Sequence, residues 1–103
     1  MTPTTYRTPE ADEDIREIAF RIGVEDGRPA TAERIIDSLL DCCERLAALS
    51  AVSKLGTSLP QLSRGVRAFS HKRWVILFRY VDDGIIVLRI ADGSQDYLSW
   101  KLE

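Results

Sequence analysis

The sequence predicts an α+β domain in which a helical hairpin precedes a β-sheet. The first half carries two stretches whose apolar residues recur at helical spacing. The second half carries runs that are rich in β-branched and aromatic residues, and a D-D-G tripeptide at 82–84 separates the two longest runs. Such a tripeptide between two apolar runs is typical of a β-hairpin turn.

The length of 103 residues is enough for one hydrophobic core and too short for two, so we expect a single domain over residues 1–103. A hydrophobic content of 45% and a charged content of 29% are ordinary for a globular protein. No apolar run in the sequence approaches the roughly 20 residues that span a bilayer. The first ten residues lack the apolar core of a signal peptide, so we expect a cytoplasmic protein without membrane contact.

The first helix is expected from about Pro9 to Ile22. Thr8 can cap it, Pro9 suits the first helical position, and carboxylates in the first turns favour the positive end of the helix dipole. Gly23 is expected to end this helix. A second helix from about Pro29 to Leu49 follows a short turn, so the two should form an antiparallel hairpin with one face to bury.

Three strands are expected, at residues 65–69, 73–81 and 85–91, after a basic loop at 53–65. A three-residue turn that ends at Gly84 would set Leu77 opposite Arg89, Arg79 opposite Val87 and Val81 opposite Ile85. Successive strand residues point to opposite faces, so this register sorts the side chains. The face toward the helices would hold Trp74, Ile76, Phe78, Tyr80, Ile86, Leu88 and Ile90, and the other face Val75, Leu77, Arg79, Val81, Ile85, Val87, Arg89 and Ala91.

Positive charge concentrates in the middle of a chain whose formal net charge is -2. Residues 45–81 contain seven lysines and arginines and no carboxylate, whereas the segments before and after them are net negative. This segregation fits an anionic partner, and it fits equally well the pairing of a basic sheet with acidic helices.

Two arginines, Arg79 and Arg89, are diagonal neighbours on the second sheet face, and Arg67 on the adjoining strand can join them. An unpaired buried guanidinium group costs several kcal/mol, so each group must pair or face solvent or a ligand. The candidate internal partners are Asp92 and Asp96, and the alternative is a ligand or partner protein.

The second face is otherwise apolar, with Val75, Leu77, Val81, Ile85 and Val87 pointing away from the helices. A monomer rarely leaves such a patch open. We therefore expect an acidic, partly disordered segment of a partner protein to fold on this face or across the helical hairpin.

The remaining chemically reactive side chains give little indication of a catalytic site. Cys42 and Cys43 are adjacent on a predicted helix, so we expect reduced thiols with at least one in the core, and neither a metal site nor a cofactor. His71 is expected in a loop as a solvent-exposed bystander, and Tyr97 and Trp100 are expected to pack on the sheet or the helices.

The sequence resembles the RelE/ParE superfamily of toxins, and most closely the ParE, or plasmid-stabilisation, branch. The branch pattern runs A-x-x-D-x-x-x-I, then G-x-R, then Y-x-I-x-Y-R, then a final motif with R, G and D. The matching residues are Ala11, Asp14 and Ile18, then Gly65 and Arg67, then Trp74, Ile76, Phe78 and Arg79, then Arg89, Ile90, Gly93 and Asp96. Asp92 stands where the branch usually has histidine, and Gln95 stands where a basic residue is frequent, so both remove positive charge beside the candidate site.

The fold implied by this resemblance is a short N-terminal strand at about Thr4–Arg7, two helices and a mainly antiparallel sheet of about four strands. The implied role is the toxin half of a type II toxin–antitoxin module. The implied partner is a cognate ParD-like antitoxin, and no direct DNA binding is expected without it.

Three functions remain open at this point. A ParE-type toxin would inhibit DNA gyrase by binding, and the candidate contact residues are Arg67, Arg79, Arg89, Asp96, Val75, Leu77 and Val87. A RelE-type toxin would cleave mRNA in the ribosome, with Arg67, Arg79, Arg89 and Tyr97 as candidate catalytic residues. A diverged, non-toxic member would bind only its antitoxin. Gyrase inhibition without enzymatic activity is the preferred hypothesis, because no general base stands out in the sequence.

Overall fold

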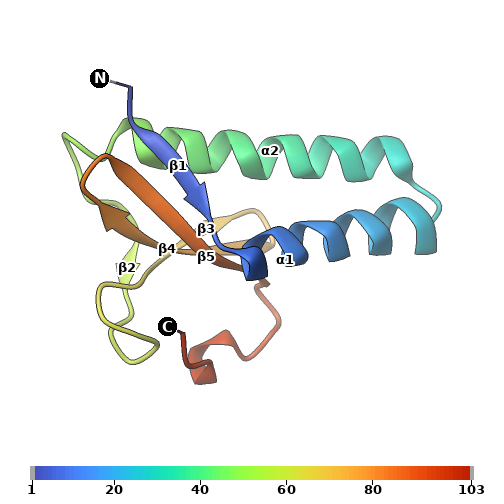
Figure 1. Cartoon of the computed structure of the whole chain (residues 1–103). Coiled ribbons are helices and arrows are strands. Elements are labelled where there is room, and N and C mark those ends of the chain that lie inside the picture. The colour runs from blue at the N-terminus through green and yellow to red at the C-terminus, as the bar shows by residue number, and fades with distance from the viewer. Residues whose placement is uncertain (1, 103) are drawn as a thin grey trace.

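Five strands and two helices form a two-layer arrangement in the computed structural model, which describes residues 2–102. The elements in chain order are β1 (Thr4–Arg7), α1 (Pro9–Phe20), η1 (Arg21–Glu25), α2 (Pro29–Ala48), β2 (Thr57–Ser58), β3 (Arg67–His71), β4 (Trp74–Val81), β5 (Gly84–Asp92) and η2 (Tyr97–Ser99). The sheet order is β1-β5-β4-β3-β2, with β1 parallel to β5 and the other pairs antiparallel. Both helices lie on one side of the sheet, and the C-terminal segment lies on the other side (Figure 1).

The α+β class and the N-terminal strand at Thr4–Arg7 are confirmed. The short strand β2 was not expected, because its two residues fall within the predicted basic loop. The prediction that Gly23 ends the first helix is wrong, since the chain continues through it as the π-helical segment η1. A Cβ atom at Gly23 would lie 3.5 Å from the Cβ atom of Ala32, so this glycine lies where the two helices pack closely. None of the helices within residues 2–102 is long and apolar enough to cross a membrane.

The pairing of β4 with β5 follows the prediction only as far as Leu77, which lies opposite Arg89. A β-bulge then places Leu88 as an extra residue on β5. The pairs beyond it are Phe78 with Val87, Arg79 with Ile86, Tyr80 with Ile85 and Val81 with Gly84. The predicted pairing of Arg79 with Val87 and of Val81 with Ile85 is therefore wrong, and the turn has two residues, because Gly84 already belongs to β5.

The bulge exchanges the two faces over the first half of β5. Ile85 and Val87 pack toward the helices, and Ile86 and Leu88 pack on the opposite face, contrary to the prediction. The inner core between the helices and the sheet contains Ala11, Ile18, Ile22, Ala32, Leu39, Cys42, Cys43, Leu46, Ala47, Trp74, Ile76, Phe78, Ile85, Val87 and Ile90. Both cysteines are thus buried, and burial raises the pKa of the Cys43 thiol to about 12, so these thiols are structural.

The second sheet face forms an outer core instead of an open patch. Val75 and Leu77 are almost fully buried there, although we expected them to be exposed. The loop before β3 and the C-terminal segment cover them, through Leu59, Leu62, Val66, Tyr97, Trp100 and Leu102. The predicted packing of Tyr97 and Trp100 on the sheet is confirmed, and the backbone N–H of Leu102 donates a hydrogen bond to the carbonyl of Leu62 at 2.8 Å.

Strand β1 pairs with β5 only as far as Val87, and the start of α1 continues the closure of that edge. The backbone N–H of Thr8 donates to the carbonyl of Val87, and its hydroxyl donates to the carbonyl of Leu88 at 2.7 Å. The same hydroxyl accepts a hydrogen bond from the N–H of Ala11 at 3.1 Å, so the predicted N-cap is confirmed. One side chain therefore both starts the helix and satisfies the strand edge.

Asp14, one and a half turns into α1, closes the next part of the same edge. Its carboxylate accepts a hydrogen bond from the backbone N–H of Ile90 at 2.9 Å. It also accepts two hydrogen bonds from the guanidinium group of Arg89, at 2.7 and 3.0 Å. The paired side chains are only 30% and 13% exposed, so this bidentate ion pair is partly shielded from water.

The tight contact between β1 and β5 predicts a severe effect of Gly84→Ala. A Cβ atom at residue 84 would overlap the carbonyl of Thr4, so β1 must move away from β5. We expect the free energy of unfolding to fall by about 3 kcal/mol or more. Gly27→Ala is the matched control, because Gly27 has φ 64 but open space around it, and it should cost only about 1–2 kcal/mol. Thermal denaturation compares the two variants. Equal losses of stability would contradict the predicted clash between a Cβ atom at residue 84 and the carbonyl of Thr4.

The edge closure by Asp14 predicts that Asp14→Ala is destabilising. The substitution removes the acceptor for Ile90 and leaves the guanidinium group of Arg89 without its carboxylate. We expect a loss of about 2–3 kcal/mol in the free energy of unfolding. Asp12 lies on the same helix but makes a more exposed ion pair, with Arg7 of β1, so Asp12→Ala should cost about 1 kcal/mol or less. Denaturant titration separates the two cases, and similar losses would mean that the Asp14 pair contributes no more than a surface pair.

Candidate functional site

Arg67 and Arg79 meet in an open depression at the end of the sheet where β3 begins and β4 ends. The depression has a volume of about 560 Å³. Its lining consists of Lys54, Arg64, Gly65, Arg67, Arg79 and Tyr80, and we call it the basic depression. Two of the three arginines singled out in the sequence therefore come together here.

Both arginines hold the chain that precedes β3 in place. Arg67 donates from Nε to the carbonyl of Leu55 at 2.7 Å and from Nη2 to the carbonyl of Gly56 at 2.9 Å. Arg79 donates from Nε to the carbonyl of Arg64 at 2.9 Å and from Nη2 to the hydroxyl of Ser63 at 3.2 Å. Because these acceptors are neutral, the two guanidinium groups are fixed in position while their charge stays uncompensated.

Tyr80 forms the aromatic part of the depression. Its hydroxyl accepts a hydrogen bond from the backbone N–H of Leu55 at 2.8 Å. Its ring packs edge-on against Phe78 with centroids 5.3 Å apart, and Nζ of Lys54 lies 4.2 Å from the ring centroid. This cation–π contact keeps the ammonium group of an otherwise exposed lysine beside the arginines.

The basic depression carries four positive charges, and none of its lining residues is a carboxylate. Within residues 2–102, the five ion pairs involve other arginines, namely Arg7, Arg16, Arg21, Arg73 and Arg89. Lys54, Arg64 and Tyr80 were not predicted as site residues from the sequence. All three lie in segment 45–81, which contains no carboxylate. The sequence did not indicate, however, where the loop of this segment lies relative to the sheet.

Arg89 does not join the other two arginines. It pairs with Asp14 on α1, and its guanidinium carbon lies 4.3 Å from the ring centroid of Trp100. The hydrogen bonds with Asp14 raise the pKa of Arg89 above its usual value. Pairing with an internal carboxylate was one of the two alternatives, but the partner is Asp14 and neither Asp92 nor Asp96.

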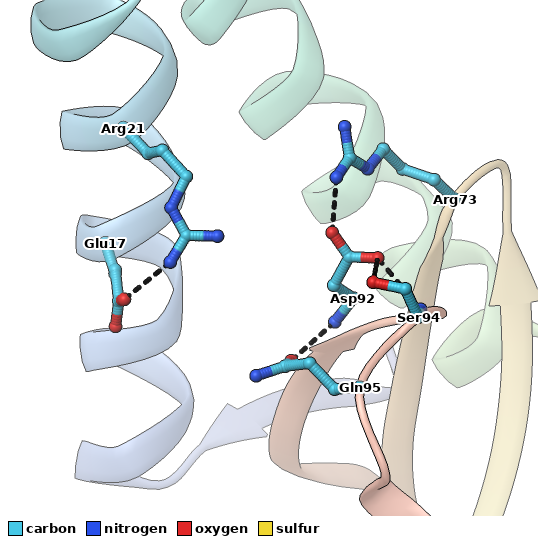
Figure 2. Close-up of polar contacts among 6 residues, drawn as sticks. All are labelled: Glu17, Arg21, Arg73, Asp92, Ser94 and Gln95. Atoms are coloured by element: carbon cyan, nitrogen blue, oxygen red, sulfur yellow. Dashed lines mark hydrogen bonds and ion pairs between the residues drawn. The ribbon is translucent and has the colours of Figure 1, made fainter.

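Asp92 ends β5 in a hydrogen-bonded turn (Figure 2). Its carboxylate accepts hydrogen bonds from the backbone N–H and the hydroxyl of Ser94, both at 3.0 Å, and pairs with Arg73. The backbone N–H of Asp92 donates to the side-chain oxygen of Gln95 at 2.8 Å. The hydrogen bond from the Ser94 backbone, followed by that from Arg73, lowers the pKa of Asp92.

The surroundings of this turn carry charges of both signs. Across from it, Arg21 at the start of η1 donates to Glu17 on α1 at 2.8 Å, and Figure 2 shows this pair facing the Asp92 turn. A small cavity of about 70 Å³ lies between them. Asp92 is opposite Trp74, at the far end of the β4–β5 hairpin from Arg79. The aspartate in place of the family histidine therefore removes no charge from the basic depression.

The remaining predicted site residues lie apart from the depression. Asp96 is exposed, and its backbone carbonyl accepts hydrogen bonds from Ser99, whereas Tyr97 is half-buried in the outer core. Val75 and Leu77 are buried in the outer core and Val87 in the inner core, so they can contact a partner only if the elements that cover them move. Their role in contacting a partner stays a prediction.

The prediction that His71 is a solvent-exposed bystander in a loop is wrong. It is the last residue of β3, half-buried, and its Nε2 atom lies 2.5 Å from the hydroxyl oxygen of Ser38 on α2. Burial, followed by the nearby charges of Lys72 and Arg45, lowers the pKa of this histidine. The histidine therefore links the β3–β4 turn to the second helix.

Comparisons with known proteins agree with this architecture. The family model described as ParE toxin of type II toxin-antitoxin system, parDE, matches residues 6–97. Toxin ParE3 of Caulobacter vibrioides is 42% identical over 48 residues, which are 47% of this chain and 48% of that protein, so the chain spans about half the length of this relative. A solved structure of a chromosomal ParDE TA system from P. aeruginosa has a TM-score of 0.68 at 22% identity, over 88% of this chain and 96% of that one.

The solved structure supports the fold, and the family match extends from the first strand to the segment after β5. The chain belongs to the ParE toxin family of type II toxin–antitoxin systems.

Proposed function

We propose that this ParE-family toxin inhibits DNA gyrase by binding and is neutralised by a ParD-like antitoxin. The observation that carries the proposal is the composition of the basic depression, which is lined by lysine, arginine, glycine and tyrosine alone. Arginine stays protonated at any accessible pH and cannot serve as a general base. Proton transfer at neutral pH is most efficient with a group whose pKa lies near that pH, most often a histidine or a perturbed carboxylate. Such a site is suited to holding an anionic surface and poorly suited to catalysis.

The geometry gives the ribonuclease alternative less support. Its four candidate residues do not share one site, because Arg89 pairs with Asp14 and Tyr97 lies in the outer core. The one histidine of the chain, His71, is four residues along β3 from Arg67, about 13 Å away at the usual rise per residue. Within residues 2–102, a bond-cleaving site at the basic depression would therefore have no histidine or carboxylate beside its arginines, and Lys54 and Tyr80 would be its only proton carriers.

The hypothesis of a diverged, non-toxic member depended on the loss of positive charge at Asp92 and Gln95. Both residues lie in the turn that follows β5, away from the basic depression. All four cations of the depression are present. An active toxin is therefore the better supported interpretation of this chain.

The helical hairpin offers a surface for an antitoxin segment. The matching family belongs to a toxin–antitoxin system, and the solved structure of similar fold is that of a ParDE system. Phe20 and Val24 are 56% and 66% exposed near the tip of the hairpin. A groove of about 410 Å³ beside them is lined by Ala19, Gly23, Val24, Pro29, Ala32, Glu33, Ile36 and Asp37. Because two carboxylates line this groove, an apolar partner segment with basic flanks fits it better than the acidic segment expected from the sequence.

The groove predicts that Val24→Asp weakens binding of the antitoxin. A third carboxylate there would be buried by the partner without a cation, so we expect the dissociation constant to rise at least about tenfold, or about 1.4 kcal/mol. Val52→Asp is the matched control, because Val52 is 79% exposed and lies after the other end of α2. Isothermal titration with the co-encoded antitoxin measures both, and equal affinities would remove the groove from the interface.

The proposed target predicts that purified toxin inhibits gyrase supercoiling, accumulates cleaved DNA and leaves ribosome-bound mRNA intact. Arg64→Glu should lose at least about tenfold in inhibitory potency, because it reverses one of four clustered charges at an exposed position. Arg28→Glu, in the loop between the helices, makes the same charge change and should retain potency. Both assays are run side by side with antitoxin-neutralised protein as the blank. Cleavage of mRNA codons with gyrase unaffected would overturn the proposal.

A further inference from the structure

The charge of the basic depression is both concentrated and fixed in place. Arg67 and Arg79 each use Nε and Nη2 to hold the loop before β3. No hydrogen bond within residues 2–102 engages Nη1 of either guanidinium group. A guanidinium group has five N–H donors, so each retains donors for a ligand. Because the side chains are already ordered, a ligand would lose little of its binding energy to freezing them.

The two remaining cations lie at the rim of the depression. The side chains of Lys54 and Arg64 are exposed, and no carboxylate pairs with either of them within residues 2–102. Gly65, with φ 80, brings the loop over the side chain of Arg79 and so places the neighbouring Arg64 beside it. Four cations around one opening of about 560 Å³ require a ligand with several closely spaced negative charges.

A nucleic-acid backbone fits these requirements better than an acidic protein surface. Duplex DNA carries one negative charge per roughly 1.7 Å of its axis, so several cations can each reach a phosphate without special arrangement. The planar guanidinium group also matches the geometry of phosphate oxygens. A protein partner would need an apolar anchor at its centre, but the ring of Tyr80 is already in contact with Lys54 and Phe78.

The depression contains no element that could read a base sequence. Its cations come from a loop and from the ends of two strands, and neither a helix nor a strand projects from it toward a groove of DNA. Contacts of this kind position a protein on the duplex without sequence specificity. Binding should therefore depend on salt and on charge, and hardly on sequence.

We infer that the basic depression, through Lys54, Arg64, Arg67 and Arg79, binds the phosphate backbone of DNA. Through this depression the toxin would contact the DNA duplex that gyrase holds. This role at gyrase rests on the proposed function. The inference replaces the expectation that the chain binds no DNA in the absence of its antitoxin. It assigns the positive charge of segment 45–81 to DNA contact and leaves the helical hairpin to the antitoxin.

The direct test is fluorescence anisotropy of a labelled random-sequence duplex, titrated with the full chain at several salt concentrations. Lys54→Gln and Arg64→Gln alter exposed side chains, so both variants should fold, which their melting temperatures verify. Each should bind about threefold to tenfold more weakly and should reduce the slope of log affinity against log salt by about 1. Arg28→Gln, in the loop at the far end of the helical hairpin (Figure 1), should match the wild type.

Two controls make the outcome decisive. Arg64→Lys keeps the positive charge and should retain most of the affinity for the duplex, whereas Arg64→Gln should lose most of it. Unchanged affinity and salt slope in both glutamine variants would overturn the inference. It would also be overturned if poly-glutamate bound the wild type more tightly than the duplex did, because the site would then be one for an acidic polypeptide.

A gyrase assay on the same proteins separates the inference from the proposed function. Gyrase inhibition without measurable duplex binding would reject the DNA contact and leave the proposed function standing. Duplex binding that the glutamine variants weaken, without gyrase inhibition, would support the DNA site and reject gyrase as the target. Parallel loss of duplex binding and of gyrase inhibition in the glutamine variants, with Arg28→Gln unaffected, would support both.

Discussion

The closure of the β5 edge is the constraint that positions the helices and, through them, the inner core. Backbone N–H and C=O groups at a strand edge must find partners, and β1 supplies them only as far as Val87. Beyond that point the N-cap residue of α1 and a residue within the helix take over, with Thr8 bonded to the carbonyl of Leu88 and Asp14 to the N–H of Ile90. The helix is thereby fixed in position and rotation on the sheet. Its apolar stripe then faces the inner core, and α2 can pack beside it.

The bulge at Leu88 lies at the point where β1 stops pairing and α1 takes over. By adding one residue to β5 it turns Ile85 and Val87 toward the helices and leaves Leu88 for the outer core. The two arginines of this hairpin meet different surroundings. Arg79 stays on a strand end that faces the loop before β3, while Arg89 lies beside α1 and receives a carboxylate. The partners that each arginine finds, Asp14 for Arg89 and neutral oxygens of the loop for Arg79, determine which one is structural and which remains available to a ligand.

The arginines of the basic depression combine a structural role with an uncompensated charge. Hydrogen bonds to the carbonyls of Leu55, Gly56 and Arg64 satisfy part of each guanidinium group without neutralising it. Elsewhere in the described chain, arginines that pair with carboxylates contribute to stability but present no net charge. This difference in acceptors explains how an acidic protein maintains one strongly positive site. It also explains why catalysis is not required to account for the arginines.

Local sequence is sufficient to predict the elements whose causes are local. Thr8 and Pro9 start α1, the β-branched runs form β4 and β5, and periodic apolar residues identify the inner faces of both helices, because capping, propensity and periodicity act over a few residues. The bulge follows from tertiary packing, since either register of β5 buries apolar residues and the choice depends on contacts from both faces. The site is tertiary as well: Lys54 and Arg64 join Arg67 and Arg79 only because hydrogen bonds over 11 to 16 residues fix the loop, and no local pattern encodes such contacts.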